Sequence, residues 1–559
     1  MEMSTYSNPI LPGFYPDPSI CRVGDDYYLV TSTFAYYPGI PIFHSKDLVN
    51  WRQIGHVLDR PSQLDLDGLR ASQGVFAPTI RYHEGTFYVI NTIVGKKGNF
   101  IVTATDPAGP WSDPYWLESE GIDPSLFFDD DGRAYYTGTR PAPEGEQYYG
   151  NWEIWLQELD LKTMKLVGET HSLWRGALRD AVWPEGPHTY KIGGYYYLLI
   201  SEGGTGPDHA ISVARSEHLL GPYVGYKKNP VLTHRHLGND YPIVNVGHSD
   251  IVETQNGEWW MVLLASRPYG GYYRNLGRET FLVPFTWEEG WPVVKPGKSI
   301  VEMTEVKPNL PEQRWVAAPA CDNFETSELG MQWMFIRTPR EAFMSLEERP
   351  GHLRLKLRPQ TLKDNAHPSF VGRRQQHIRF SARAAMEFAP QAEHESAGLV
   401  VLQNNQFHFR FEYMLSKGTK VLRLTRCSQG EDEVLAEQAV DAGKLYLTIE
   451  VVFRQAKIPK KIVHFSPSSS WGIFSPFFHE RVLHSVALAL KNEQVPMVCQ
   501  TVNHGRCHLV IGEDSPPLGE LQIRRNDQAA TLVAVRNHPK EQLRAVLVDG
   551  NIAPLVKDE

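Results

Sequence analysis

The sequence predicts an all-β protein, with a five-bladed β-propeller followed by a β-sandwich. Three observations support this fold class. Five related strand–turn–strand segments recur at blade-sized spacing, no helical periodicity is long enough for a crossover helix, and the later chain changes to plain two-residue alternation. A chain of 559 residues is also too long for a single core. We expect a propeller over residues 1–300, a linker over 301–321 and a sandwich domain over 322–559.

Each of the five segments reads as a strand, a tight turn and a second strand rich in aromatic residues. The turns contain GDD, EG, DDDG, GG or NG, which tolerate positive φ in hairpins. The segments begin 46 to 63 residues apart, and a further strand pair follows each one, which gives four strands per unit. A sandwich or several unrelated β domains would not explain this repetition. The segments are DPSICRVGDDYYLVTST, APTIRYHEGTFYVINTI, DPSLFFDDDGRAYYTGT, EGPHTYKIGGYYYLLIS and HSDIVETQNGEWWMVLL.

The first positions of these segments carry the candidate site. In a propeller the equivalent strand of each blade lines the central channel, so equivalent positions meet at one end of the axis. Those positions hold Asp17, Ala77, Asp123, Glu185 and His248. Any one polar residue among them is equally well explained as a turn residue at a strand start, but their common register favours a site. We therefore expect three carboxyl groups and a histidine to converge from four blades.

The chemistry that such a cluster favours is hydrolysis of a glycosidic bond. The sequence has no phosphate-binding loop, no nucleophilic serine elbow and no cofactor fingerprint, and we expect no required cofactor. Glycoside hydrolysis needs one protonated carboxyl group for the leaving oxygen and one ionised carboxylate. A third negative charge nearby can raise the pKa of the proton donor. Three converging acids meet these requirements.

The stretch FYPDPSI places Asp17 between two prolines. Proline fixes its own φ, and Pro18 steers the residue before it toward the extended region. We therefore expect Asp17 to start a strand in an extended conformation.

Composition limits the partners. The 56 basic and 65 acidic residues give a net charge of −9 without a long basic run, which argues against nucleic acid and anionic membranes and favours a neutral substrate. Together with the cluster of acids, this leads us to expect a small oligosaccharide as the partner. The N-terminus has no signal-like segment, and no apolar run is long enough to span a bilayer, so we expect a cytoplasmic protein. The five cysteines show no metal-binding spacing and are expected to be reduced thiols. An assembly of identical chains stays open.

The motifs FYPDPSI, GIDPSLF and WPEGPH, in this order, resemble family 43 of the glycoside hydrolases. The likeness extends through VGHSD and NLGRETF and covers residues from about Asn8 to Pro296. It implies a five-bladed propeller that acts on xylose- or arabinose-containing chains with inversion of configuration. By this resemblance Asp17 is the general base, Glu185 the general acid and Asp123 the residue that tunes the acid, while His248 and Arg278 match active-site positions.

The stretches TSTFAYYPGIPIFHSKDLVNW and SEGGTGPDHAISVARS resemble the exo-acting β-xylosidase and α-L-arabinofuranosidase branch of that family. We accordingly expect Phe34, Phe76, His248 and Arg278 to contact the substrate. Phe76 replaces the branch's usual Trp, and Ala35 replaces a bulkier or acidic residue, so the preferred sugar stays open. The leading interpretation is a β-xylosidase; an α-L-arabinofuranosidase or a bifunctional enzyme is the alternative. A fructoside-cleaving propeller or a sugar-binding propeller without catalysis fits the acid motifs less well.

Metal sites are harder to read from the sequence. FDDDGR, which contains Asp129 to Asp131, lacks the ligand spacing of a calcium loop and is expected to be a hairpin turn. His479 and His484 lie five apart, which is not the spacing of a helical zinc pair. Some members of the family hold a structural calcium ion near the histidine on the axis, so such an ion beside His248 is a further expectation.

Beyond the propeller the sequence changes character. VKPGKSIVEMTEVKPNLPEQRWVAAP is spaced by prolines and reads as a linker. HLRLKLRP then places Leu353, Leu355 and Leu357 on one face of an expected strand, and the following segments alternate in the same way. This region resembles the concanavalin-like domain found after such propellers. From residue 451 onward we expect neither alternation nor the family's motifs.

Overall fold

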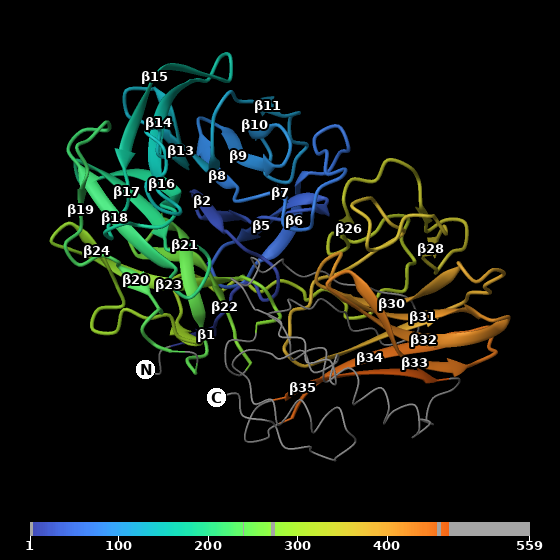
Figure 1. The fold of residues 1–559 in the computed structure, drawn as a ribbon. Coiled ribbons are helices and arrows are strands. Elements are labelled where there is room, and N and C mark those ends of the chain that lie inside the picture. The colour runs from blue at the N-terminus through green and yellow to red at the C-terminus, as the bar shows by residue number, and fades with distance from the viewer. Residues whose placement is uncertain (1–3, 239, 270–273, 455–459, 469–559) are drawn as a thin grey trace. The chain divides into compact units, whose positions relative to one another are not determined.

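The computed structural model describes residues 4–238, 240–269, 274–454 and 460–468 of the chain. All of the elements in these ranges are β-strands (Figure 1), so the predicted all-β class is confirmed. None of the described residues forms a helix that could cross a membrane. The chain divides into two compact units. The first contains residues 1–268, 278–317 and 337–340, and the second contains 269–277, 318–336 and 341–559.

The first unit contains five antiparallel sheets in chain order, one for each predicted blade. The first sheet is β2 (Ser19–Val23), β3 (Asp26–Val30), β5 (Gly39–Ser45) and β6 (Arg52–Leu58), with β4 (Tyr36–Tyr37) between β3 and β5 in the chain. The second is β7 (Gly74–Val75), β8 (Thr79–His83), β9 (Thr86–Val94), β10 (Gly98–Ala104) and β11 (Tyr115–Trp116). The third is β12 (Ile122–Phe128), β13 (Ala134–Pro141), β14 (Trp152–Asp160) and β15 (Lys165–Trp174). The fourth is β16 (Glu185–Ile192), β17 (Tyr195–Glu202), β18 (Ala210–Ser216), β19 (Val224–Gly225) and β20 (Leu232–Thr233). The fifth is β21 (Val244–Glu253), β22 (Trp259–Ser266), β23 (Glu279–Glu288) and β24 (Trp291–Val294).

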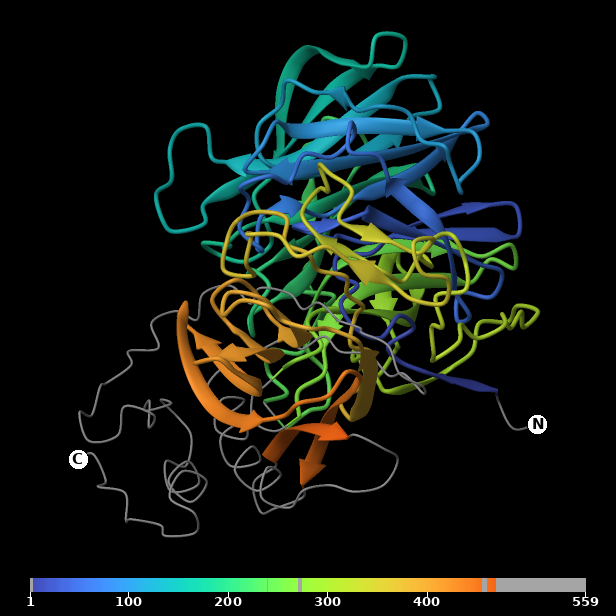
Figure 2. The ribbon, with the colours of Figure 1, turned by 90° about the vertical axis from the view of Figure 1, so that its right-hand side faces the viewer.

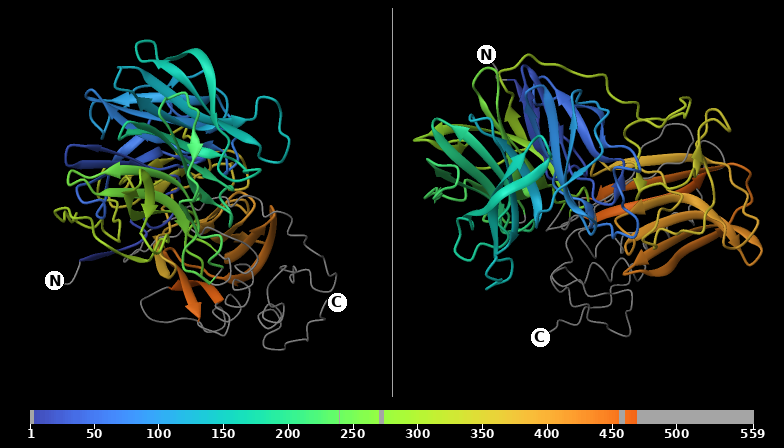
Figure 3. Two further views of the ribbon diagram at one scale, coloured as in Figure 1. Left: turned by 90° about the vertical axis from the view of Figure 1, so that its left-hand side faces the viewer. Right: turned by 90° about the horizontal axis from the view of Figure 1, so that it is seen from above.

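The first full strand of each repeat lies at the centre of the ring. Strands β2, β8, β12, β16 and β21 contact one another in succession, and β21 returns to β2. The sheets are seen from other sides in Figures 2 and 3. The hairpins that follow the inner strands turn at the predicted residues, with φ of 81° at Gly132 and 78° at Gly257, which an L side chain would adopt only with strain. The FDDDGR segment is one of these turns, as expected.

Aromatic and aliphatic side chains fill the space between neighbouring sheets. Between the second and third sheets, Ile90 and Ile101 pack with Leu126, Tyr136 and Trp155, all of them buried. This follows from the two-residue period of the strands, which presents alternate side chains to each neighbouring blade. Burying such rings removes roughly 150–250 Å² each from water. The abundance of aromatic residues in the sequence is therefore largely a property of the core.

A buried ion pair holds the inner strands together near the axis. The Arg81 guanidinium on β8 donates to Asp250 on β21 at 2.8 Å and contacts His188 Nδ1 on β16 at 2.9 Å. The hydroxyls of Ser19 and Tyr190 also donate to Asp250, at 2.6 and 2.5 Å. Although burial opposes ionisation, Arg81 holds the pKa of Asp250 below its usual range. Four inner strands are thereby joined through one carboxylate.

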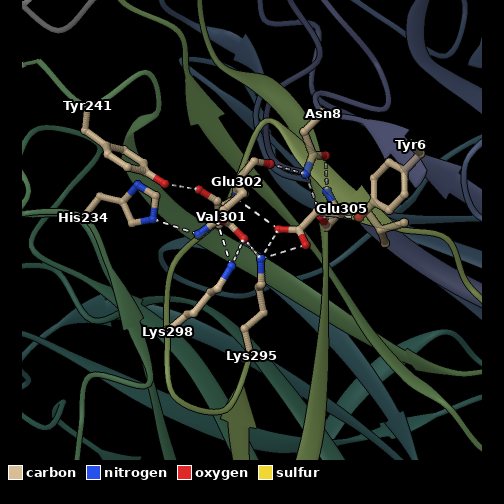
Figure 4. A network of polar contacts seen from close by, with 10 residues as sticks. Tyr6, Asn8, His234, Tyr241, Lys295, Lys298, Val301, Glu302 and Glu305 are labelled. Carbon is tan, nitrogen blue, oxygen red and sulfur yellow. Dashed lines mark hydrogen bonds and ion pairs between the residues drawn. The ribbon is translucent and has the colours of Figure 1, made fainter. Parts of the chain in front are cut away.

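The ring closes where the N-terminal segment meets the end of the fifth sheet (Figure 4). Strand β1 (Thr5–Ser7) pairs with β25 (Thr304–Val306), which lies inside the predicted linker. The Asn8 amide donates to the Leu282 carbonyl at 2.9 Å and accepts from the Leu282 amide at 3.0 Å. The first and last parts of the propeller are thus joined by backbone pairing.

A lysine supports this closure. The Lys295 ammonium lies 2.8 Å from both carboxylate oxygens of the buried Glu305 and also pairs with Glu302 (Figure 4). On the same side, His234 Nε2 accepts from the Val301 amide at 3.0 Å. A buried acid that lost its cation would be costly, so Lys295 stabilises the strand that ends the ring.

The second unit contains two larger antiparallel sheets, the orange strands of Figure 2, in line with the sandwich expected there. Short strands precede them, and HLRLKLRP forms a strand only at two residues, so the prediction of one long alternating strand was wrong; Leu357 is 50% exposed. The short strands are β26 (Phe335–Ile336), β27 (Met344–Ser345) and β28 (Arg354–Leu355). One large sheet is β29 (Phe380–Met386), β34 (Leu445–Arg454) and β35 (Lys460–Ser468). The other is β30 (Ser396–Leu402), β31 (His408–Ser416), β32 (Thr419–Ser428) and β33 (Glu431–Ala439).

The irregular segment expected after residue 450 is also corrected in part. Strand β34 continues to Arg454 and pairs antiparallel with β35. The stretch KIVHFSPS within β35 does not alternate cleanly, which is why its strand could not be read from the pattern. Cys499, Cys507, His479 and His484 lie outside the described residues.

Candidate active site

The candidate site lies where the inner strands begin. Asp17 precedes β2 by two residues, Asp123 is the second residue of β12, Glu185 is the first of β16, and His248 lies within β21. The register argument therefore places these four side chains at one end of the ring, as predicted. Ala77, at the equivalent place before β8, leaves the second blade without a polar group there.

The backbone at these positions differs from the expected extended form. Asp17 has φ of 54°, so the prediction that Pro18 makes it extended was wrong. Asp123 and His248 are also left-handed, with φ of 51° and 44°. Aspartate tolerates this region better than most residues, but it still costs on the order of 1 kcal/mol or more. Three unfavourable conformations at one site indicate that the fold is built to aim these side chains.

Irregular strand pairing accompanies these conformations. The register shifts between Ile122 and Ser125 on β12 and between Glu185 and His188 on β16. A similar shift surrounds His248 on β21. A bulge bends the strand and redirects a side chain. In three blades the irregular pairing falls at a residue of the site, namely Asp123, Glu185 or His248, where a bulge can redirect the side chain.

The carboxyl group of Asp17 is held in place by two partners. Arg278 Nη1 donates to its Oδ1 at 2.7 Å, and the Ser32 hydroxyl donates to its Oδ2. All three residues are buried. The two contacts fix the position of the Asp17 carboxyl group beside a guanidinium, as expected of a base that must be oriented toward a water molecule.

Glu185 has the opposite environment. Burial raises its pKa well above the ordinary value, and the negative charges of Asp123 and Asp17 raise it further, against a smaller opposing effect of Arg278. Its carboxyl group is therefore favoured in the protonated form. One acid that is paired with a cation and another that is kept neutral are the two states that the reaction requires.

Asp123 interacts electrostatically with both Asp17 and Glu185. Burial raises its pKa to about 6, His248 opposes the rise, and Asp17 adds to it. The amide of Gly186, the residue after Glu185, donates to Asp123 Oδ2 at 3.2 Å. Asp123 thus contacts the backbone that carries Glu185 and also acts on its charge state.

His248 completes the polar cluster. Its backbone amide donates to the Ser201 hydroxyl at 2.6 Å, and its ring packs so closely on Gly186 that an added Cβ there would lie 3.0 Å from Nδ1. Gly186 has φ of 56°. A side chain at residue 186 would therefore displace the ring and strain the backbone beside Glu185.

An aromatic group borders the acids. The rings of Phe34 and Phe76 are 5.0 Å apart between centroids, and the Arg278 guanidinium lies 5.5 Å from the Phe34 ring. All seven residues predicted for the site are therefore linked by contact or charge within the first unit. Their roles in a reaction stay predictions.

Sequence reasoning missed several supporting residues. Ser32, Ser201 and His209 are buried in contact with the site, and an added Cβ at Gly247 would fall within 2.2 Å of the His209 ring. His209 belongs to the motif SEGGTGPDHAISVARS, but only its buried position marks it. Burial lowers the pKa of His209 to about 3, so this ring is neutral.

A distant segment fixes the loop that carries Phe34. The Arg337 backbone amide donates to the Ala35 carbonyl at 2.8 Å, and Arg337 Nε donates to the Leu69 carbonyl at 2.7 Å. The Leu66 amide donates to the Thr338 hydroxyl at 3.2 Å. No sequence pattern connected residues 337–340 with the propeller, because the contact uses backbone carbonyls rather than a motif.

Among the described residues, no group of three His, Cys, Asp or Glu side chains that could share a metal ion lies beside His248. The deeper carboxylate, Asp250, already accepts from Arg81, Ser19 and Tyr190. Within the described ranges, the group of three potential ligands that lie close enough to share a metal is His408, Cys427 and Asp432, in the second unit. A calcium ion beside His248 would need ligands other than a protein cluster of this kind and stays a prediction.

Comparisons with known proteins show which proteins this chain is similar to. A family model described as glycosyl hydrolases family 43 matches residues 6–292, and one described as the beta xylosidase C-terminal concanavalin A-like domain matches residues 321–462. A xylosidase/arabinosidase of Butyrivibrio fibrisolvens is 52% identical over 81% of this chain and 88% of its own length. A non-reducing end alpha-L-arabinofuranosidase of Bacteroides ovatus is 45% identical over 76% and 79%. The crystal structure of a xylan beta-1,4-xylosidase from Bacillus halodurans superposes with a TM-score of 0.79 at 35% identity, over 89% of this chain and 95% of that one.

Proposed function

Because this chain belongs to family 43 of the glycosyl hydrolases, we propose that it removes terminal β-D-xylose from xylo-oligosaccharides with inversion of configuration. The observation that carries the proposal is the contrast between the environments of two carboxyl groups: Asp17 is paired to Arg278, whereas the pKa of Glu185 is raised, which favours its neutral form. Removal of α-L-arabinofuranose by the same site is the second candidate. It is favoured by the relatives whose names include arabinosidase or arabinofuranosidase.

In the proposed mechanism Asp17 removes a proton from a water molecule as that water attacks the anomeric carbon. Glu185 donates its proton to the glycosidic oxygen as the bond to the leaving group breaks. The two carboxyl groups must be separated by roughly 6.5–9.5 Å to admit the water. Asp123 raises the pKa of Glu185 and holds its neighbouring backbone, and Arg278 orients Asp17. The Phe34 and Phe76 rings offer apolar surface to the sugar.

The stereochemistry of the product tests this assignment. We expect proton NMR of the first turnovers on an aryl β-xyloside to show α-xylose before mutarotation, because a single displacement by water inverts the anomeric centre. The same measurement on an aryl α-L-arabinofuranoside, at matched enzyme concentration, compares the two sugars. Release of β-xylose first would contradict the role of Asp17 as a base, and hydrolysis of neither substrate would contradict the proposed function.

The pH dependence tests the role of Asp123. Glu185 must be protonated to act, so activity is expected to fall as pH rises through its raised pKa. Asp123→Asn removes one of the charges that raise this pKa, and we expect the alkaline limb of kcat/KM to move to lower pH by on the order of one unit. The measurement is a pH profile of kcat/KM for an aryl xyloside. Asp130→Asn, in the exposed turn of the same hairpin, is the matched control and should leave the limb in place.

We also propose a cytoplasmic location. Its support is chemical: the buried Cys21 and Cys427 are free thiols, as expected in a reducing compartment. Fractionation of the source cells with detection of the glycosidase activity would test it, and activity confined to the medium or envelope would contradict it.

A further inference from the structure

An exposed aromatic residue lies beside the segment that leads into Glu185. Tyr149, between β13 and β14, is 74% exposed, which is unusual for so large a ring in this unit. Its centroid lies 5.0 Å from that of Trp183, and the two rings meet edge to face. Trp183 precedes Glu185 by two residues. Neither Tyr149 nor Trp183 takes part in the proposed mechanism.

The topology places both rings at the catalytic end of the propeller. Inner strands start at that end, so the second strand of each sheet returns to it. Ile122, beside Asp123, pairs with Thr139 near the end of β13, and Glu185 pairs with Ser201 near the end of β17. The loop from β13 to β14, which carries Tyr149, therefore starts next to the acids.

Hydrogen bonds join this loop to the segment before Glu185. The Trp183 amide donates to the Gly150 carbonyl at 2.8 Å, and the Tyr148 hydroxyl donates to the Ala181 carbonyl at 3.1 Å. The Thr139 hydroxyl donates to the Pro184 carbonyl at 2.5 Å. The two aromatic side chains are thus held at a fixed distance from the proton donor.

Two glycines make room for the Trp183 ring. A Cβ at Gly204 would lie 2.7 Å from its Cε3, and a Cβ at Gly150 would lie 3.0 Å from its Nε1. Both glycines have positive φ, and so does Trp183, at 48°. Trp183 thus has a strained backbone, packs against two glycines and contacts the exposed Tyr149. The fold holds this aromatic surface in place at a conformational cost, which indicates a function for it.

The direction of proton transfer indicates that Tyr149 and Trp183 would contact the leaving group of the substrate. Glu185 donates to the oxygen of the leaving group, so the departing part of the substrate lies on the side of Glu185, while Asp17 lies across the scissile bond. A pyranose ring presents C–H groups on its faces, which pack favourably on aromatic rings. Phe34 and Phe76 come from the first two blades, whereas Tyr149 and Trp183 come from the third blade and the segment before the fourth.

We propose that Tyr149, supported by Trp183, is the platform for the first sugar of the leaving group. This inference rests on the proposed function, because it takes Glu185 as the general acid and a xylo-oligosaccharide as the substrate. Tyr149 then determines which leaving groups the enzyme prefers and has no part in the bond-breaking step.

The experiment compares two substrates that share the xylose to be released. Xylotriose has a sugar leaving group, whereas methyl β-xyloside has only methanol. Tyr149→Ala is expected to lower kcat/KM for xylotriose by about five- to tenfold, the effect of one lost aromatic contact, and to leave that for methyl β-xyloside unchanged. Tyr149→Phe should retain the preference. Tyr115→Ala, an exposed tyrosine on the edge strand β11, is the matched control and should change neither substrate.

The ratio of the two kcat/KM values decides the outcome. If Tyr149→Ala lowers kcat/KM equally for both substrates, the loop only positions Glu185 and the proposal is overturned. If kcat/KM changes for neither substrate, the proposal is overturned as well. Trp183→Phe, which keeps an aromatic side chain, is a second test. It should lower the ratio of kcat/KM for xylotriose to that for methyl β-xyloside by a smaller amount than Tyr149→Ala. Failure of the proposed function is distinct, since the unsubstituted enzyme would then hydrolyse neither xyloside.

Discussion

Glu185→Gln is expected to lower kcat/KM for xylobiose by about 10³-fold, within the range typical of a lost general acid. Glutamine has nearly the same shape, but its amide cannot supply the proton that the leaving oxygen needs. The loss should be smaller for an aryl xyloside with an acidic phenol, since that leaving group departs without protonation. A plot of log(kcat/KM) against leaving-group pKa, measured for the parent and the variant, is the decisive comparison.

The control for this variant is Glu169→Gln, an exposed glutamate on β15 in the neighbouring sheet. It should leave both the rate and the slope of the plot unchanged. A Glu185→Gln enzyme with the parental slope would show that another group protonates the leaving oxygen, and the assignment of Glu185 would then be wrong.

Asp17→Asn is expected to lower kcat/KM by about 10³-fold or more for every substrate. Water must be activated whatever the leaving group, so the loss should not depend on the leaving-group pKa. Asparagine also tolerates the left-handed backbone that residue 17 adopts, so the substitution tests the carboxylate with little change in conformation. Circular dichroism and xylose binding by calorimetry check that the variant is folded.

Asp25→Asn, in the exposed turn after β2, is the matched control and should have parental activity. Asp17→Asn leaves Arg278 without its carboxylate partner, and some loss of stability is expected from that alone. A variant that loses its activity only on poor leaving groups would contradict the role of Asp17 as the base. The contrast in leaving-group dependence between residues 17 and 185 separates the two roles.

The register of the repeat was enough to predict which side chains meet. Asp17, Asp123, Glu185 and His248 are far apart in the sequence, yet the first three lie at the start of the inner strand of their unit and His248 lies within that of the fifth. A closed ring brings these strands together. Phe34, Phe76 and Arg278 followed from motifs around them. The positions came from repetition, which a single sequence carries plainly.

The conformation of those residues could not be read in the same way. Pro18 predicted an extended backbone at Asp17. The contacts that orient its carboxylate outweigh this local preference and hold residue 17 in the left-handed region. The support from Arg337 and Thr338 could not be predicted either, because both side chains donate to backbone carbonyls, which carry no sequence signal. In the second unit, Leu353, Leu355 and Leu357 alternate well, yet a strand forms only where a partner is present to pair with it.

The left-handed backbone at Asp17, Asp123 and His248 has a consequence for how this enzyme can evolve. Glycine would fit each position more comfortably, but it would remove the very group that each position presents. Substitutions that stabilise the protein without loss of activity are therefore expected outside these three positions, for example near Lys295 and β25, where the two ends of the propeller are joined.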